Sequence, residues 1–175
     1  MKKVVLDTSS IISLSLIGLL AKCLQNFEII IPKSVIKELK DASTYKDAIG
    51  KVATDVVKLI TQGKIVVYSV KDHGNVRSLL SSDVGLGEAE CLVCCIENKI
   101  PLLVTDDIDA MYSLEDIAVI NDIETNISIW LLAELEGNRI ITKENAVTYI
   151  KRLIKLREWE GGVLEVLSEK YLEKL

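Results

Sequence analysis

The sequence has little of the residues that interrupt or cross-link a fold. It holds one histidine, two prolines and nine glycines in 175 residues. So few prolines and glycines leave little room for disordered linkers, and there is no low-complexity tract or internal repeat. The lone His73 is a poor metal site without a partner ligand. A chain of this length and composition is therefore expected to form one domain over residues 1–175.

A disulfide framework is also missing. Cys23 stands alone, whereas Cys91, Cys94 and Cys95 lie inside one apolar run. No second ligand pair accompanies that run, so a zinc site through Cys91-x2-Cys94-Cys95 is the weaker interpretation and buried helical cysteines are the stronger. Free cysteines are typical of a reducing compartment. We therefore expect a cytoplasmic protein.

No apolar run approaches the roughly 20 residues that span a bilayer. Met1-Lys2-Lys3 followed by apolar residues resembles a signal peptide, but Asp7 interrupts that segment. We expect no membrane association.

An excess of positive charge is missing too, because the formal net charge is −5. This disfavours a uniformly basic surface for nucleic acid, although an acidic site neutralised by bound cations stays compatible with it.

Short apolar segments alternate with helical patterns along the chain. Strands are expected at residues 3–6, 27–31, 65–70, 101–104 and 117–120. Helices are expected at residues 10–24, 32–40, 46–61, 86–98, 108–114, 127–136, 143–157 and 162–173. The segment 72–83 is expected to be polar and loop-like, with at most one helical turn. Apolar strands alternating with helices predict an α/β fold, a three-layer α/β/α sandwich with a central parallel sheet and further helices at the C-terminus.

Acidic residues directly follow two of the expected strands. Asp7 follows the first strand, and Asp106 and Asp107 follow the fourth. Ligand sites of open parallel sheets lie at the carboxyl ends of the strands, so these acids are expected at one edge. Glu38 lies on the helix after the second strand, which begins at the same edge. The place of Glu88 stays open, because its helix leads into a strand.

Four short motifs in this order resemble a PIN domain over about residues 3–135: Leu6-Asp7-Thr8-Ser9, a helix with Glu38 after Ile-Pro, Gly87-Glu88-Ala89-Glu90, and Leu103-Val104-Thr105-Asp106-Asp107. This family includes VapC-type toxins and related stand-alone nucleases. The Gly-Glu-Ala-Glu and Asp-Asp forms are most similar to a poorly characterised prokaryotic PIN subfamily. The resemblance implies a nuclease core of about residues 3–135 with a helical extension at about 136–175.

The resemblance also implies a metal-dependent endoribonuclease that uses Mg²⁺ or Mn²⁺. The implied catalytic and metal-binding acids are Asp7, Glu38, Glu88 and Asp107, with Glu90 and Asp106 as further metal ligands. Many family members have aspartate where this chain has Glu88. Hard divalent cations prefer such oxygen ligands, and they remove the repulsion between converging carboxylates. A bound ion would activate water and neutralise charge on the scissile phosphate of RNA.

Two further groups are candidates for substrate contacts. Hydroxyl groups beside the acids are the first group, and they belong to Thr8, Ser9 and Thr105. Thr8 or Ser9 would orient substrate or a carboxylate, and Thr105 would bind substrate. A basic stripe in the C-terminal region consists of Lys151, Arg152 and Lys155. A solvated helix face is the default interpretation of that stripe, and a contact to the RNA backbone is the alternative.

Three classes of function compete. Taken singly, each acid could simply cap a helix or lie on a solvated face. A PIN-like module that binds RNA or protein without cutting is the main alternative to the nuclease, which could be a toxin or an RNA-processing enzyme. An aspartyl-phosphate phosphatase ranks lowest, because Asp7-Thr8-Ser9 lacks a second aspartate two residues on. The expected partners are RNA, a second copy in a homodimer and, for a toxin, a small antitoxin protein.

Overall fold

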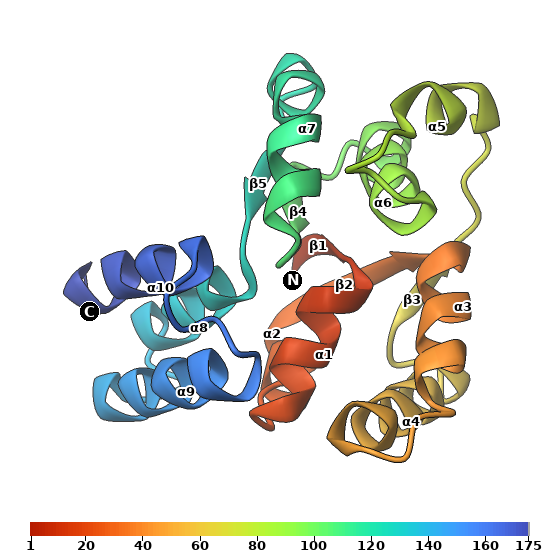
Figure 1. Ribbon diagram of the computed structural model, residues 1–175. Coiled ribbons are helices and arrows are strands. Elements are labelled where there is room, and N and C mark those ends of the chain that lie inside the picture. The colour runs from red at the N-terminus through yellow and green to blue at the C-terminus, as the bar shows by residue number, and fades with distance from the viewer. Residues whose placement is uncertain (175) are drawn as a thin grey trace.

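A single parallel sheet forms the centre of the protein (Figure 1). The computed structural model describes residues 1–174. Its strands are β1 (Lys2–Leu6), β2 (Phe27–Pro32), β3 (Val66–Tyr68), β4 (Leu102–Val104) and β5 (Glu124–Asn126). They lie in the order β3-β2-β1-β4-β5, and each neighbouring pair is parallel. The chain moves outward from β1 first to one side and then, from β4, to the other, so β1 and β4 flank the point where ligands bind in such sheets.

Helices cover both faces of the sheet, which confirms the three-layer α/β/α prediction (Figure 1). They are α1 (Thr8–Leu16), α2 (Leu20–Asn26), α3 (Lys33–Ala42), α4 (Ala48–Thr61), α5 (His73–Leu79), α6 (Leu86–Asn98), α7 (Ile108–Ile120), α8 (Ser128–Gly137), α9 (Lys143–Leu156) and α10 (Val163–Lys174). α6 packs on β1, β2 and β4 from one face. α1 and α2 lie on the other, together with α8 and α9, and α10 packs on those last two.

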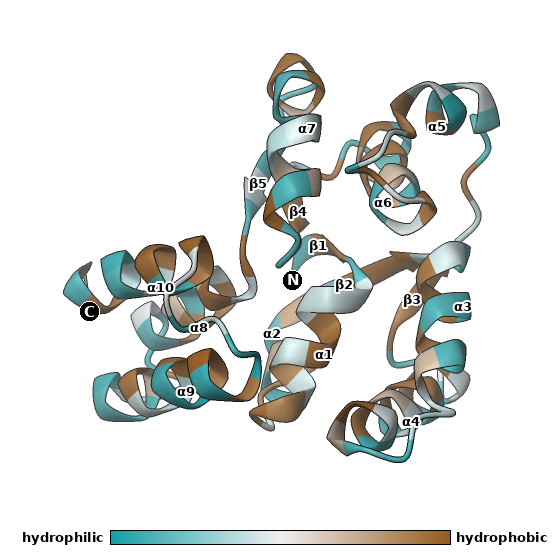
Figure 2. Cartoon of the chain, viewed as in Figure 1, coloured by the Kyte–Doolittle hydropathy of each residue, from teal (hydrophilic) through white to brown (hydrophobic). Residues whose placement is uncertain are grey.

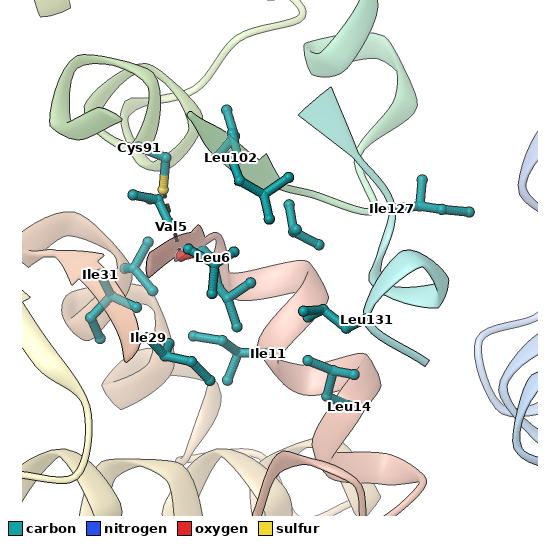
Figure 3. Packing of buried hydrophobic residues seen from close by; sticks show 14 of the residues in the cluster. Val5, Leu6, Ile11, Leu14, Ile29, Ile31, Cys91, Leu102, Ile127 and Leu131 are labelled. Atoms are coloured by element: carbon teal, nitrogen blue, oxygen red, sulfur yellow. Dashed lines mark hydrogen bonds between the residues drawn. The ribbon is translucent and has the colours of Figure 1, made fainter. Parts of the chain in front are cut away.

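The core consists of aliphatic side chains on both sides of β1 (Figure 3). Successive side chains of a strand point to opposite faces, so Val5 lies towards α6 while Leu6 lies towards Ile11 of α1. All four cysteines are free and buried, as the core interpretation predicted. The thiol of Cys91 donates to the carbonyl oxygen of Leu6 (3.7 Å). Burial raises the pKa of Cys23 to about 12, so this thiol stays protonated.

The prediction of one continuous helix over residues 10–24 is wrong. Two helices, α1 and α2, occupy this segment, and the chain bends by 114° between them. Gly18 lies at the bend with a φ of +76°, a left-handed conformation that glycine adopts without the steric cost of a side chain. In residues 1–174 no single helix is long and apolar enough to cross a membrane; only this bent pair meets the test, by length and composition.

The predicted position of the fifth strand is also wrong. Residues 117–120 form the last turn of α7, and β5 is the polar segment Glu124–Asn126. The β-branched run suggested a buried strand, yet Ile120 is 79% exposed. Asp122 (φ +55°) ends the helix and turns the chain into β5. The expected loop-like segment at 72–83 contains α5. Asp72 caps the N-terminus of this helix, because its side chain accepts from the Asn75 backbone N–H (2.9 Å).

Candidate active site

Asp7 lies at the end of β1 and caps the N-terminus of α1. Its side chain is almost fully buried, with 1% exposed. Three groups donate to this carboxylate: the Ser10 backbone N–H (2.8 Å), the Ser9 hydroxyl (2.7 Å) and the Thr105 hydroxyl (2.7 Å). Hydrogen bonds to an ionised acceptor are strong, so these donors fix the orientation of the carboxylate.

The same two hydroxyls join the ends of β1 and β4. Thr105 Oγ1 donates to Asp7 and accepts from the Asp107 backbone N–H (3.0 Å). Ser9 Oγ donates to Asp7 and accepts from the Asp106 backbone N–H (2.9 Å). Thr105 is predicted to contact substrate, and in the structure its hydroxyl donates to Asp7. The turn after β4 is thereby held against the start of α1, which brings Asp107 to the edge where Asp7 lies.

Glu38 reaches this edge from α3, which begins directly after β2. The hydroxyl of Thr8 donates to Glu38 Oε2. On its other side the Glu38 carboxylate packs against Gly87 of α6, where an added Cβ would lie 2.5 Å from Oε1. That approach is possible only because Gly87 has no side chain. Neither the sequence motif nor the spacing of the acids indicated this contact.

Glu88 lies in the first turn of α6. A helix that returns the chain to the start of a parallel strand runs opposite to that strand, so its N-terminus lies at the carboxyl edge. Glu88 therefore lies at the same edge of the sheet as Asp7, a place that the strand order alone did not determine. The carboxylate folds back over Gly85, where an added Cβ would lie 2.8 Å from Glu88 Oε2.

The four acids Asp7, Glu38, Glu88 and Asp107 interact electrostatically. Burial raises the pKa of Glu38, and the negative charge of Asp7 adds to the increase. Burial likewise raises the pKa of Glu88, which also feels the charges of Asp7, Glu38 and Asp107. Like charges held near one another disfavour full ionisation. Asp7 thus acts on Glu38 and Glu88, and Asp107 acts on Glu88. These four acids are named here the carboxylate cluster.

Asp106 and Glu90 are held by the starts of two helices. Asp106 is buried, its Oδ1 accepts from the Ser128 backbone N–H at the start of α8 (2.7 Å), and burial raises its pKa. Glu90 Oε2 accepts from the Ser34 backbone N–H at the start of α3 (3.1 Å). Both carboxylates thus stabilise helix N-termini that adjoin the carboxylate cluster.

The donor chemistry of the cluster suits Mg²⁺ or Mn²⁺, which prefer carboxylate oxygen. None of the ion pairs found in residues 1–174 involves the four acids, so their negative charge has no cationic side chain beside it. Within that same range no three Asp, Glu, His or Cys side chains are grouped tightly enough to hold an ion. One reason is that Asp107 Oδ1 accepts from Ala110 N–H (3.0 Å) as the cap of α7, while Glu88 folds back onto α6.

Stability should depend on the ionisation of this cluster. The folded state raises the pKa of Glu38 and Glu88 above their ordinary value of about 4.5. Their stabilising contribution to the free energy of unfolding is therefore complete below pH 4.5, and it is lost as the pH rises through the raised pKa values. In EDTA at about pH 4.5, a Glu38→Gln/Glu88→Gln variant should have a melting temperature near that of the wild type. Towards neutral pH its melting temperature should exceed that of the wild type by a growing margin. Thermal melts across this range test the expectation, and a gap that is constant with pH would contradict it.

Added Mg²⁺ should raise the melting temperature of the wild type at neutral pH, because a cation bound only by the folded state stabilises it. The double variant, which has lost two carboxylates, should respond less.

Comparison with known proteins identifies the family of the chain. A family model described as a PIN domain matches residues 3–163. The matched segment begins within β1, contains β2 to β5 and runs through the end of α9 (Lys143–Leu156), past the limit of about 135 expected for the motifs. No curated protein matches the chain.

Proposed function

The chain belongs to the PIN-domain family, which has a nuclease-type fold, and from that premise we propose that it is a metal-dependent endoribonuclease. The reaction is the hydrolysis of RNA phosphodiester bonds. The observation that supports it most directly is the carboxylate cluster, in which acids from four separate segments lie close enough for the charges of Asp7, Glu38 and Asp107 to raise the pKa of Glu88. Perturbed acids that converge without a cationic partner are typical of a metal-dependent site.

Asp7, Glu38, Glu88 and Asp107 would hold one or two Mg²⁺ or Mn²⁺ ions. Such an ion supplies activation of the attacking water and neutralisation of charge on the scissile phosphate. Asp7 and Glu38 are already oriented by hydroxyl donors. Glu88 and Asp107 would turn from their helix N-termini towards the other two acids.

Three hydroxyl groups act as positioning residues in this proposal. Ser9 and Thr105 fix the carboxylate of Asp7, and Thr8 fixes that of Glu38. Each hydroxyl donates its only proton to a carboxylate, which fixes the orientation of that carboxylate. Partners of this kind commonly change metal affinity or activity about 10- to 100-fold when they are removed.

The experiment that tests the function is cleavage of labelled single-stranded and structured RNA in Mg²⁺, Mn²⁺ or EDTA. Cleavage in either metal and none in EDTA is the expected result. RNA that is bound but left intact in both metals would contradict the nuclease and favour the non-catalytic binding module. Substrate RNA that is neither bound nor cut would exclude both functions.

The cellular part of the proposal is a cytoplasmic homodimer that acts as the toxin of a toxin–antitoxin pair. Four free, buried cysteines agree with a reducing compartment. A small antitoxin protein would then bind near the carboxylate cluster. Growth arrest on expression of the wild type, absent with an Asp7→Asn variant, would support the toxin; normal growth with both would favour RNA processing.

A further inference from the structure

Three lysines project from one face of α3. Lys33, Lys37 and Lys40 are all exposed. At about 3.6 residues per turn, their positions fall within an arc of about 60°. None of the three forms an ion pair in the part of the chain that the structure describes. This face therefore carries three positive charges that no carboxylate within 4 Å neutralises.

The lysines border a groove between α3 and the edge strand β3. It has a volume of about 390 Å³ and is lined by Lys33, Ile36, Lys37, Lys40 and Val67. The two apolar members form part of its surface, and Val67 is 40% exposed. Figure 2 shows teal segments along α3 next to the brown ribbon of β2. The groove thus combines cationic groups with apolar surface, and we name it the α3 groove.

The α3 groove adjoins the carboxylate cluster without overlapping it. Lys33 is the first residue of α3 and directly follows β2, at the edge where the acids gather. Lys37 precedes Glu38 in the chain, so their side chains leave the helix about 100° apart. The exposed Asp41, four residues after Lys37, lies between the lysines and Glu38 on the helix surface, and its charge raises the pKa of Glu38. One helix therefore presents an acid to the cluster and lysines to the groove beside it.

We propose that the α3 groove binds the backbone of single-stranded RNA, at nucleotides that flank the bond to be cut. This inference rests on the proposed function and names the path of its substrate. A chain with a net charge of −5 must bring a polyanion up to four carboxylates, and a local cationic track reduces that repulsion. Ile36 and Val67 favour a single strand, because its unpaired bases and riboses can lie on apolar surface.

The stripe of Lys151, Arg152 and Lys155 on α9 is the competing cationic surface. Figure 1 shows α9 and α3 on opposite sides of α1. The α9 stripe is also exposed and free of ion pairs in the described range, so it has the same charge as the α3 lysines. It therefore supplies a matched control, in which three positive charges are removed from a different face.

The test compares two triple variants, Lys33→Gln/Lys37→Gln/Lys40→Gln and Lys151→Gln/Arg152→Gln/Lys155→Gln, each in an Asp7→Asn background. Fluorescence anisotropy with a labelled single-stranded RNA gives the affinity over a range of salt concentrations. Loss of three phosphate contacts should weaken binding about 10- to 100-fold near 0.1 M salt and reduce the slope of log K against log salt by about 2. The α9 variant should keep the affinity and slope of the background protein.

Two outcomes would overturn the α3 groove: an α3 variant that binds as the background protein does, or an α9 variant that loses as much affinity. The first would leave the groove to another occupant, such as an acidic protein. Circular dichroism checks that the variants fold, which we expect because surface substitutions change stability little. Binding and cleavage are separate readouts, so wild type that binds through the groove without cutting would refute the nuclease alone.

Discussion

Asp7→Asn should lower the rate of metal-dependent RNA cleavage at least about 100-fold and leave the fold intact. Asparagine keeps the size of the side chain and can still accept from the Ser10 N–H, so the cap of α1 survives. It removes the negative charge, and its amide nitrogen cannot accept from the hydroxyls of Ser9 and Thr105. A divalent cation thereby loses as a ligand the acid nearest the centre of the sheet.

The matched control for this variant is Asp47→Asn. Asp47 caps α4 in the same way, by accepting from the Gly50 N–H (2.9 Å), and it belongs to no part of the carboxylate cluster. Its cleavage rate should equal that of the wild type. Initial rates at saturating Mg²⁺ and thermal melts measure both variants side by side. A folded Asp7→Asn protein that cuts RNA at the wild-type rate would refute the proposed role of this acid.

The sequence was sufficient to place the acids that follow strands. Asp7 comes directly after β1 and Asp107 lies three residues after the end of β4, and these strands are neighbours in the sheet. Because parallel strands end at the same edge of the sheet, their positions in the sequence are enough to place both acids at that edge. Strands β1 to β4 could be predicted because each contains an apolar run, which is typical of a sheet covered on both faces.

Two elements were harder to predict, for opposite reasons. The segment 117–120 is β-branched but ends a helix, since the packing of α7 and the turn at Asp122 decide its conformation. Strand β5 contains Glu124 and Asn126 and lies at the edge of the sheet, so it needs no apolar run. Local composition was misleading at both places because tertiary context outweighs propensity.

Residues that hold the acids were the least visible from sequence. Thr8 and Ser9 were expected to orient substrate or a carboxylate, and in the structure both donate to carboxylates. The Thr105 hydroxyl reaches Asp7 across 98 positions of the chain. Gly87 gave only one signal, its place beside Glu88 in a helix, where glycine is otherwise unfavourable. Its contact with Glu38 depends on how α3 and α6 pack.

Gly87→Ala should therefore reduce cleavage about 10- to 100-fold without destabilising the protein. The new Cβ would lie 2.5 Å from Glu38 Oε1 and 3.1 Å from its Cδ, so the carboxylate must move. The atoms that give way are the far end of a flexible side chain, and the fold can accommodate the change. Alanine in place of glycine within α6 should even add up to about 1 kcal/mol of stability.

Gly137→Ala is the control for the change in helix propensity. Gly137 ends α8 with no atom within 4 Å of an added Cβ, so alanine there should leave activity unchanged. If Gly87→Ala acts through Glu38, it should cost little further activity in a Glu38→Gln background, because the two changes then remove the same ligand. Independent, multiplying losses would show that Gly87 affects cleavage by another route. Full activity in the single Gly87→Ala variant would refute a fixed position of Glu38 as a requirement for the reaction.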